Sequence, residues 1–216
     1  MMCLDLVRQK LHQEHTPPGG TSYWIQMTDL PEKIFEPAQF LVENIRLLPK
    51  GQVLDVAMGT GSNAVFLALK GFEVEGVDIS ADAVTTALEL AHQSGVDLKT
   101  RIADLESNYV IQGNSYDIII CFKYLHRALI QQMKDGLRTG GVVVYETFIV
   151  DQARFGKPKK LDHLLRHNEL LDLFRDFRCL RYREGIFETR RAMASIIAEK
   201  TSTQPNPNVS TYSKNF

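Results

Sequence analysis

One segment, Val53 to Gly61, constrains the fold of this 216-residue chain more than any other. Its first residues are apolar and predict a buried strand that ends on a carboxylate, Asp55. Three small residues follow at alternate positions, Ala57, Gly59 and Gly61, and an apolar helical pattern comes next. A loop without bulky side chains leaves its backbone N–H groups accessible to a ligand. The segment therefore predicts a strand, a loop and a helix that together bind a nucleotide-type cofactor.

Two classes of cofactor fit this loop. The run from Gly59 to Ala64 matches the relaxed dinucleotide fingerprint, in which two glycines precede a third small residue. The same stretch, taken from Asp55, places an acid before Ala57, Gly59 and Gly61. A carboxylate that faces the loop repels a pyrophosphate but suits a cofactor with an ammonium group and a sulfonium. Asp55 therefore favours a positively charged cofactor, while a tight turn without any ligand is the third alternative.

The rest of the chain alternates strand and helix patterns. The first strand begins at Val53, and further strands are predicted at 73–78, 98–103, 116–122 and 142–146, the last after a turn at 140–141. Helices are predicted at 38–48, 64–69, 81–94, 128–137 and 164–174. Two final strands, 177–182 and 191–199, are separated by 184–187, too short a segment for a crossover helix. They are therefore expected to pair antiparallel.

This layout differs from a dinucleotide-binding domain, whose sixth strand is also parallel. Together with the acid and small residues of 55–61 and the segment Gly76-Val77-Asp78-Ile79-Ser80, it resembles class I S-adenosylmethionine (AdoMet) methyltransferases. Ala57 departs from the glycine usual in that family. The resemblance implies an α/β fold, a doubly wound, seven-stranded Rossmann-like sheet with a terminal antiparallel hairpin. It covers residues 38–199, which leaves 1–37 as an N-terminal arm and 200–216 as a disordered tail.

The resemblance also implies which residues bind AdoMet. Asp78 ends the second strand, where the family places an acid that accepts hydrogen bonds from the ribose hydroxyls. Asp104 matches the acid that family members place beside the adenine amino group. The expected cofactor-binding residues are Asp55, Ala57, Gly59, Gly61, Asp78, Ile79, Asp104 and Leu105. A helix cap at Asp78 and an Asx turn at Asp104 are the structural alternatives.

The segment after the fourth strand lies where this fold places the reacting methyl group. It lacks the Asn/Asp-Pro-Pro-Tyr signature of amino-group methylation. The runs 124–127 and 145–148 instead resemble small-molecule methyltransferases related to the tellurite-resistance group. His126 and Glu146 are the candidate general bases, and the candidate substrate-binding residues are Lys123, Tyr124, Arg127 and Arg154. A structural histidine and solvated surface charges are the alternatives.

A long basic insertion, 147–164, connects the fifth strand to the next helix. Long loops at the active edge of a sheet often form lids or substrate walls. We therefore expect this insertion to border the substrate, unless it is simply an exposed loop.

Composition narrows the function further. The net charge is −1 and the pI about 6.6, so no global basic field attracts nucleic acid. The three cysteines, Cys3, Cys121 and Cys179, form no CxxC pair, which predicts a reducing compartment and no zinc site. The start of the chain lacks the apolar core of a signal peptide, and no metal constellation of the catechol type is present.

The sequence thus predicts a cytoplasmic enzyme that uses AdoMet to methylate a small, anionic molecule, without a metal or a membrane. Three alternatives remain open at this point. An RNA methyltransferase is motivated by the basic residues between Arg154 and Arg191. A non-catalytic AdoMet-binding protein would share the same loop, and a nicotinamide-dependent oxidoreductase is disfavoured by Asp55 and the terminal hairpin.

Overall fold

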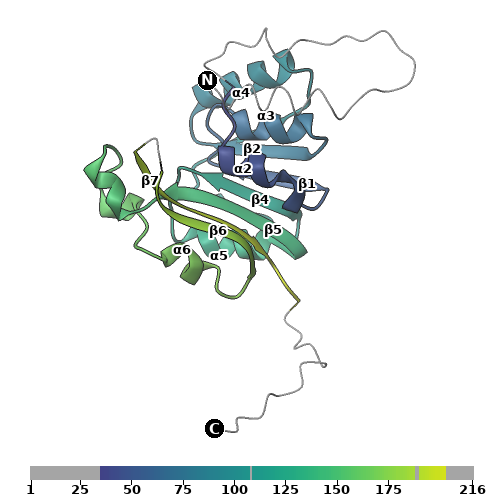
Figure 1. Cartoon of the computed structure of the whole chain (residues 1–216). Coiled ribbons are helices and arrows are strands. Elements are labelled where there is room, and N and C mark those ends of the chain that lie inside the picture. Colours follow the sequence, from purple (N-terminus) through teal and green to yellow (C-terminus); the bar gives the residue numbers. More distant parts are fainter. Residues whose placement is uncertain (1–34, 108, 188–189, 203–216) are drawn as a thin grey trace, which may run out of the picture.

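The computed structural model describes residues 35–107, 109–187 and 190–202. Their centre is a seven-stranded sheet with the order β3-β2-β1-β4-β5-β7-β6 (Figure 1). The strands are β1 (Gln52–Val56), β2 (Glu73–Asp78), β3 (Lys99–Ile102), β4 (Tyr116–Phe122), β5 (Leu137–Phe148), β6 (Arg178–Phe187) and β7 (Arg191–Glu199). Strands β1 to β5 pair parallel, and β7 runs antiparallel to both β5 and β6. The predicted doubly wound sheet with a terminal antiparallel hairpin is confirmed.

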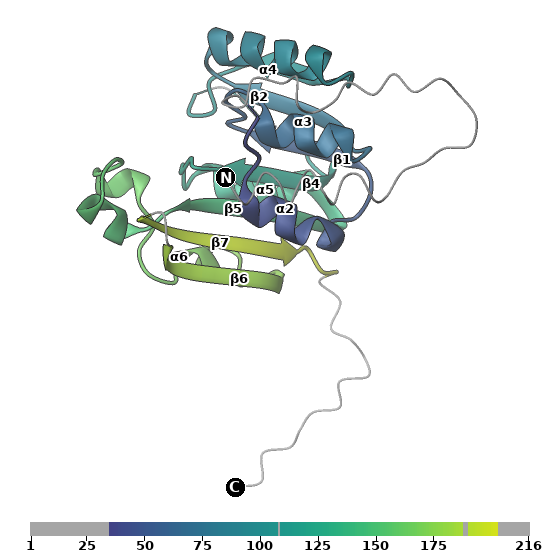
Figure 2. The same cartoon turned by 45° about the horizontal axis from the view of Figure 1, so that its top comes forward.

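Helices cover both faces of the sheet (Figure 2). The helices are α2 (Gln39–Asn44), α3 (Ser62–Leu69), α4 (Ala81–Gln93), α5 (Leu129–Gly136) and α6 (Glu169–Leu173). Residues of α2, α3 and α4 form one apolar cluster with one face of the sheet, and residues of α5 and α6 form a second cluster with the other. Strand β4 supplies both, because Ile118 and Ile120 point to the first while Ile119 and Cys121 point to the second. This explains why its sequence is apolar almost throughout.

Two predicted boundaries near the end of the chain are wrong. The helix predicted at 164–174 is only α6, because Leu165 pairs with the end of β5 and Asn168 adopts a left-handed φ of 63°. The residues 184–187, predicted to separate the last two strands, belong to β6, whose pairing with β7 continues to Phe187 and Arg191. Long-range strand pairing overrides the local pattern in both places.

Strand β5 also begins earlier than predicted. The glycines at 140–141, expected as a turn before the strand, lie within it, at a shift in register between β4 and β5. The N–H of Gly140 donates to the carbonyl of Lys200 (2.7 Å), and the N–H of Lys200 donates to Gly141 (2.8 Å). The residue that follows β7 therefore holds the glycines in the sheet.

Most of the predicted arm at 1–37 and of the tail at 200–216 lies outside the described residues, so these two divisions stay predictions. Among the helices described, none combines the length and apolar character needed to span a membrane.

Candidate functional site

The loop after β1 turns through three left-handed residues. Ala57, Gly59 and Gly61 have φ angles of 56°, 59° and 80°. Gly61 is also the residue that precedes α3, and a Cβ there would lie 2.6 Å from the Cβ of Ala87 in α4. Glycine is therefore required at Gly61 by both backbone conformation and packing. The loop is therefore packed closely against α4 at Gly61, and its role as a cofactor loop stays a prediction.

Asp78 lies at the end of β2, beside this loop. Its Oδ2 accepts a hydrogen bond from the N–H of Gly59 (2.7 Å), and its Oδ1 accepts one from the N–H of Ser80 (2.9 Å). The side chain of Ser80 in turn caps α4 by accepting from the N–H of Ala83 (3.2 Å). A carboxylate has about four acceptor positions, so Asp78 retains capacity for two ribose hydroxyls while it holds the loop.

Asp55 is a buried carboxylate in β1, with 2% of its surface exposed. Its Oδ2 has no hydrogen-bond partner among the described residues. Burial raises the pKa of the Asp55 carboxyl well above its ordinary value, and the neighbouring Asp78 carboxylate raises it further. A buried polar atom without a partner calls for an explanation, and a ligand that carries an ammonium group fits this position in charge and in hydrogen bonding.

The other predicted cofactor-binding residues, Ile79, Asp104 and Leu105, follow the ends of β2 and β3. The Oδ1 of Asp104 accepts from the N–H of Glu106 (2.9 Å), so the Asx turn that was the structural alternative is present. Leu105 is buried, whereas Ile79 is 64% exposed. An exposed isoleucine beside the loop offers an apolar surface to a flat ring. The contacts of these residues with adenine stay predictions.

A cavity of about 780 Å³ opens next to the end of β4. Its volume lies in the range of small-molecule sites. Its lining comes from three segments, the residues after β4, the end of β5 and the insertion: Lys123, Tyr124, Leu125, Phe148, Lys157, Pro158, Lys159, Lys160 and His163. The insertion thus borders a cavity, as a substrate wall would, and four of the lining residues are lysines.

The predicted substrate-binding residues divide into two groups. Lys123 and Tyr124 line the cavity, whereas Arg127 and Arg154 are not among its lining residues. Arg154 is exposed and forms an ion pair with Asp151 (3.5 Å) within the insertion. Arg127 is bound to Glu169 and to backbone carbonyls of the insertion.

The sequence interpretation missed the individual lining lysines of the insertion. Lys157, Lys159 and Lys160 were noted only as part of a basic loop. The available signal was the clustering of three lysines within four residues beside Pro158.

The two candidate bases differ in their surroundings. Glu146 is buried, and its Oε2 accepts hydrogen bonds from the hydroxyl of Ser195 (2.5 Å) and from a guanidinium nitrogen of Arg183 (3.1 Å). His126 is half-buried in the turn between β4 and α5, and its carbonyl accepts from the N–H of Leu129 (3.1 Å). The structure therefore gives Glu146 internal partners, and a catalytic role for either residue stays a prediction.

The backbone after β4 is fixed by strand β5. Lys123, which has a left-handed φ of 58°, donates its N–H to the carbonyl of Glu146 (2.8 Å). The hydroxyl of Tyr145 donates to the carbonyl of Tyr124 (2.9 Å), and the hydroxyl of Tyr124 donates to Glu106 (3.2 Å). Burial, aided by the Glu106 carboxylate, raises the pKa of Tyr124 above its ordinary value. Tyr124 therefore stays a neutral phenol at physiological pH.

Comparisons with known proteins agree with this geometry. Residues 53–141 match the family model described as a methyltransferase domain. The chain is 25% identical over 160 residues to a probable S-adenosyl-L-methionine-dependent methyltransferase, TehB, of Haemophilus influenzae, which covers 70% of this chain and 54% of that protein. It is 31% identical over 121 residues to a ubiquinone biosynthesis O-methyltransferase of Rickettsia prowazekii, with 50% and 46% covered.

The crystal structure of TehB from Haemophilus influenzae superimposes with a TM-score of 0.64 at 20% identity, over 76% of this chain and 62% of that one. This chain spans about half the length of the curated relatives it matches. Residues 53–141 thus match a methyltransferase domain, and the described residues share the fold of the TehB structure. In sequence and in fold, the chain is similar to TehB.

Proposed function

We propose that this chain is an AdoMet-dependent methyltransferase whose acceptor is a small, anionic molecule. The observation that carries the proposal is a buried oxygen of Asp55, which has no partner among the described residues and lies next to the Gly59–Asp78 hydrogen bond. AdoMet carries an ammonium group and ribose hydroxyls, which match these two carboxylates in charge and in hydrogen bonding. A dinucleotide would bring a pyrophosphate towards the same two acids, and Coulomb repulsion opposes that.

When bound, AdoMet supplies a methyl group on a positively charged sulfur. Transfer in line removes that charge, so the protein contributes mainly alignment of the acceptor and exclusion of water. In this chain the segment after β4 performs the alignment, because bonds from Lys123 and to Tyr124 fix its backbone against β5. A soft anionic nucleophile needs no base. If the acceptor reacts through a hydroxyl or an amine, we favour His126 as the base, since the Glu146 carboxylate already accepts hydrogen bonds from Arg183 and Ser195.

The lysines of the cavity support an anionic acceptor. Lys123 follows the end of β4, and Lys157, Lys159 and Lys160 line the same cavity from the insertion. Cations around a partly closed cavity attract anions more strongly as the bound molecule excludes water. The sequence predicted that Arg127 and Arg154 bind the anionic acceptor. We now assign that role to the three lysines of the insertion instead.

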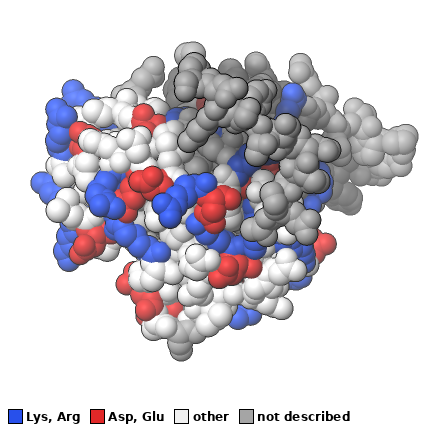
Figure 3. All heavy atoms as spheres, turned by 90° about the horizontal axis from the view of Figure 1, so that it is seen from below, with Lys and Arg blue, Asp and Glu red and all other residues white. Residues whose placement is uncertain are grey.

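The RNA alternative receives less support. The face drawn in Figure 3 intersperses positive and negative side chains among the described residues, and the net charge is −1. Retention on heparin at physiological salt would favour this alternative. We place the proposed activity in the cytoplasm, which the scattered cysteines support; of the described ones, Cys121 is buried and Cys179 exposed, and both are free.

Calorimetric titration tests the cofactor. We expect AdoMet and S-adenosylhomocysteine to bind and NAD not to bind. Asp78→Ala should weaken the binding free energy of S-adenosylhomocysteine by about 1.5–3 kcal/mol, the scale of hydrogen bonds to a charged group. Asp82→Ala, an exposed acid in the first turn of α4, is the matched control. Binding of NAD without AdoMet would contradict the proposal.

A screen of methyl acceptors that reports release of S-adenosylhomocysteine tests the acceptor class. Lys123→Gln and Lys160→Gln should each lower kcat/KM for the acceptor about tenfold, the scale of one charge-assisted contact. Lys99→Gln, an exposed lysine in β3, should change nothing. A neutral or cationic acceptor would contradict the anionic part of the proposal.

A further inference from the structure

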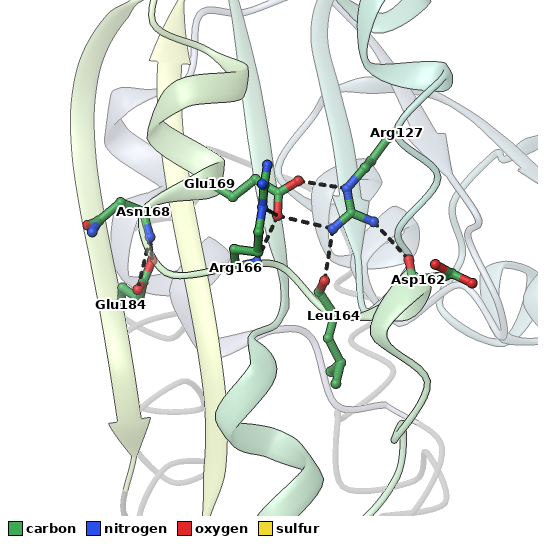
Figure 4. A network of polar contacts seen from close by, with 7 residues as sticks. All are labelled: Arg127, Asp162, Leu164, Arg166, Asn168, Glu169 and Glu184. Carbon is green, nitrogen blue, oxygen red and sulfur yellow. Dashed lines mark hydrogen bonds and ion pairs between the residues drawn. The ribbon is translucent and has the colours of Figure 1, made fainter.

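Arg127 connects the segment after β4 to the end of the insertion and to α6 (Figure 4). Its Nε and Nη2 donate to the two carboxylate oxygens of Glu169, at 2.6 and 3.0 Å. Its Nη1 donates to the carbonyl of Asp162 (3.0 Å), and its Nη2 also donates to the carbonyl of Leu164 (2.9 Å). All three guanidinium nitrogens are therefore engaged within the protein.

Glu169 is a firm anchor for this guanidinium. It is 5% exposed, at the start of α6. Its Oε2 also accepts from the backbone N–H of Arg166 (2.7 Å) and from its Nε (3.4 Å). The Arg127 hydrogen bond, together with that backbone N–H, lowers the pKa of Glu169 to about 2. The carboxylate is therefore ionised at physiological pH.

The positions of these contacts connect them to the cavity. Arg127 follows Leu125, which lines the cavity from the β4 side, by two residues. Asp162 and Leu164 are the two neighbours of His163, which lines the cavity from the insertion. One side chain thus holds the segment after β4 to a segment 35 to 42 residues further along the chain.

We propose that Arg127 is a positioning residue that holds the insertion wall, residues 157–163, in place against the end of β4 and so shapes the acceptor cavity. This proposal rests on the proposed function, because it assigns the cavity to the acceptor. It differs from a direct contact between Arg127 and an anionic acceptor, in which only the positive charge matters.

Conservative substitutions separate these two roles. Lysine keeps the charge of Arg127, but an ammonium cannot reproduce the planar fork that reaches Glu169 and both carbonyls. Arg127→Lys therefore impairs a positioning residue and spares a residue that acts only by charge. Glu169→Gln removes a negative charge near the cavity, which strengthens anion binding if charge alone matters and weakens it if the wall must be held.

The experiment uses the full chain and three measurements. Hydrogen–deuterium exchange reports the 157–165 segment, calorimetry with inorganic pyrophosphate probes the lysine-lined cavity, and calorimetry with S-adenosylhomocysteine probes the cofactor site. We expect Arg127→Lys and Glu169→Gln each to raise the exchange rate in 157–165 tenfold or more. Each should also weaken the affinity for pyrophosphate fivefold or more. Affinity for S-adenosylhomocysteine should stay within twofold of the unmodified protein.

Arg138→Lys is the matched control. Arg138 is 39% exposed, close to the 38% of Arg127, and its Nη1 binds Asp117 at 2.7 Å, where β5 begins. This variant should leave all three measurements unchanged.

The positioning role is overturned if Arg127→Lys leaves exchange in 157–165 unchanged. It is also overturned if Glu169→Gln binds pyrophosphate more tightly than the unmodified protein does. Equal losses of S-adenosylhomocysteine and pyrophosphate affinity also overturn it, because they indicate general destabilisation. If the unmodified protein binds no pyrophosphate, the anionic acceptor fails, and if it binds no S-adenosylhomocysteine, the cofactor assignment fails. In either case exchange in 157–165 still decides whether Arg127 holds the wall.

Discussion

The proposed cofactor side and the proposed acceptor side of this domain are built from parts at very different distances along the chain. On the cofactor side, Asp55, the loop at 57–61 and Asp78 lie within one strand–helix–strand unit, and the bond from Gly59 to Asp78 spans 19 residues. On the acceptor side, Arg127 bonds to partners 35, 37 and 42 residues away. The first site is a local structure, whereas the second depends on how an insertion docks.

This difference has an energetic side. The cofactor loop depends on backbone conformations and close packing that only small residues allow, as at Gly61. The acceptor wall depends on charge-assisted hydrogen bonds between side chains and carbonyls of separate segments. Substitutions should therefore damage the cofactor side through steric clashes and the acceptor side through lost hydrogen bonds and ion pairs.

The largest effect is expected on the cofactor side. Gly61→Ala should destabilise the protein by roughly 2–4 kcal/mol, because a left-handed alanine is strained and its Cβ meets Ala87. Gly59→Ala, with a φ of 59° and no atom of the described residues within 4 Å of the added Cβ, should cost only about 1 kcal/mol. Urea denaturation of both variants measures the difference, and equal losses would remove the packing argument.

The next effect concerns the acceptor side and its dependence on pH. Glu169→Gln should cost about 2–3 kcal/mol at pH 7, somewhat less than loss of a fully buried ion pair because Arg127 is partly exposed. The folded pKa of Glu169, about 2, lies below its ordinary value of 4.5, so the stabilisation is complete above pH 4.5. It is lost as the pH falls towards 2. Urea denaturation at pH 7, 5, 4 and 3 should show a shrinking difference, and a constant one would refute the ionic contribution.

A smaller effect is expected at Asp55, where removing the carboxylate should raise the stability of the protein but weaken cofactor binding. The raised pKa of Asp55 means that the folded protein without cofactor disfavours the carboxylate, so wild-type stability falls as the pH rises above 3.8. Asp55→Asn should therefore raise stability at pH 7 by roughly 0.5–2 kcal/mol, yet weaken the affinity for S-adenosylhomocysteine. Thermal denaturation and calorimetry measure the two quantities. The exposed Asp97→Asn serves as control, and a destabilised Asp55→Asn protein would contradict the argument.

The smallest effect is expected at Ala57. Its φ of 56° strains an alanine, and glycine relieves about 1 kcal/mol of that strain while adding about 0.5 kcal/mol of unfolded-state entropy. Ala57→Gly should thus leave stability unchanged or slightly raised, with the same affinity for S-adenosylhomocysteine. A clear loss of stability in urea denaturation would show that the methyl group of Ala57 contributes packing.

The sequence by itself determined most of the sheet and the outline of the cofactor site. Strands β2 and β4 begin and end at the predicted residues, and the apolar run of β4 is buried between two layers of helices. The glycines at 59 and 61 allow a left-handed loop, since few other residues adopt that conformation without strain, whereas the left-handed φ of Ala57 came only from the structure. These features depend on nearest neighbours along the chain and are therefore visible in it.

Only the tertiary structure decided the acceptor side. The helical pattern from Leu164 gives way to pairing of Leu165 with the end of β5, and the charge of Arg127 is directed to Glu169 instead of the cavity. Three lysines of the insertion line that cavity in its place. A charged side chain can reach many partners, and which partner it meets depends on the docking of distant segments. The free energy of that docking is shared among contacts that no local pattern encodes.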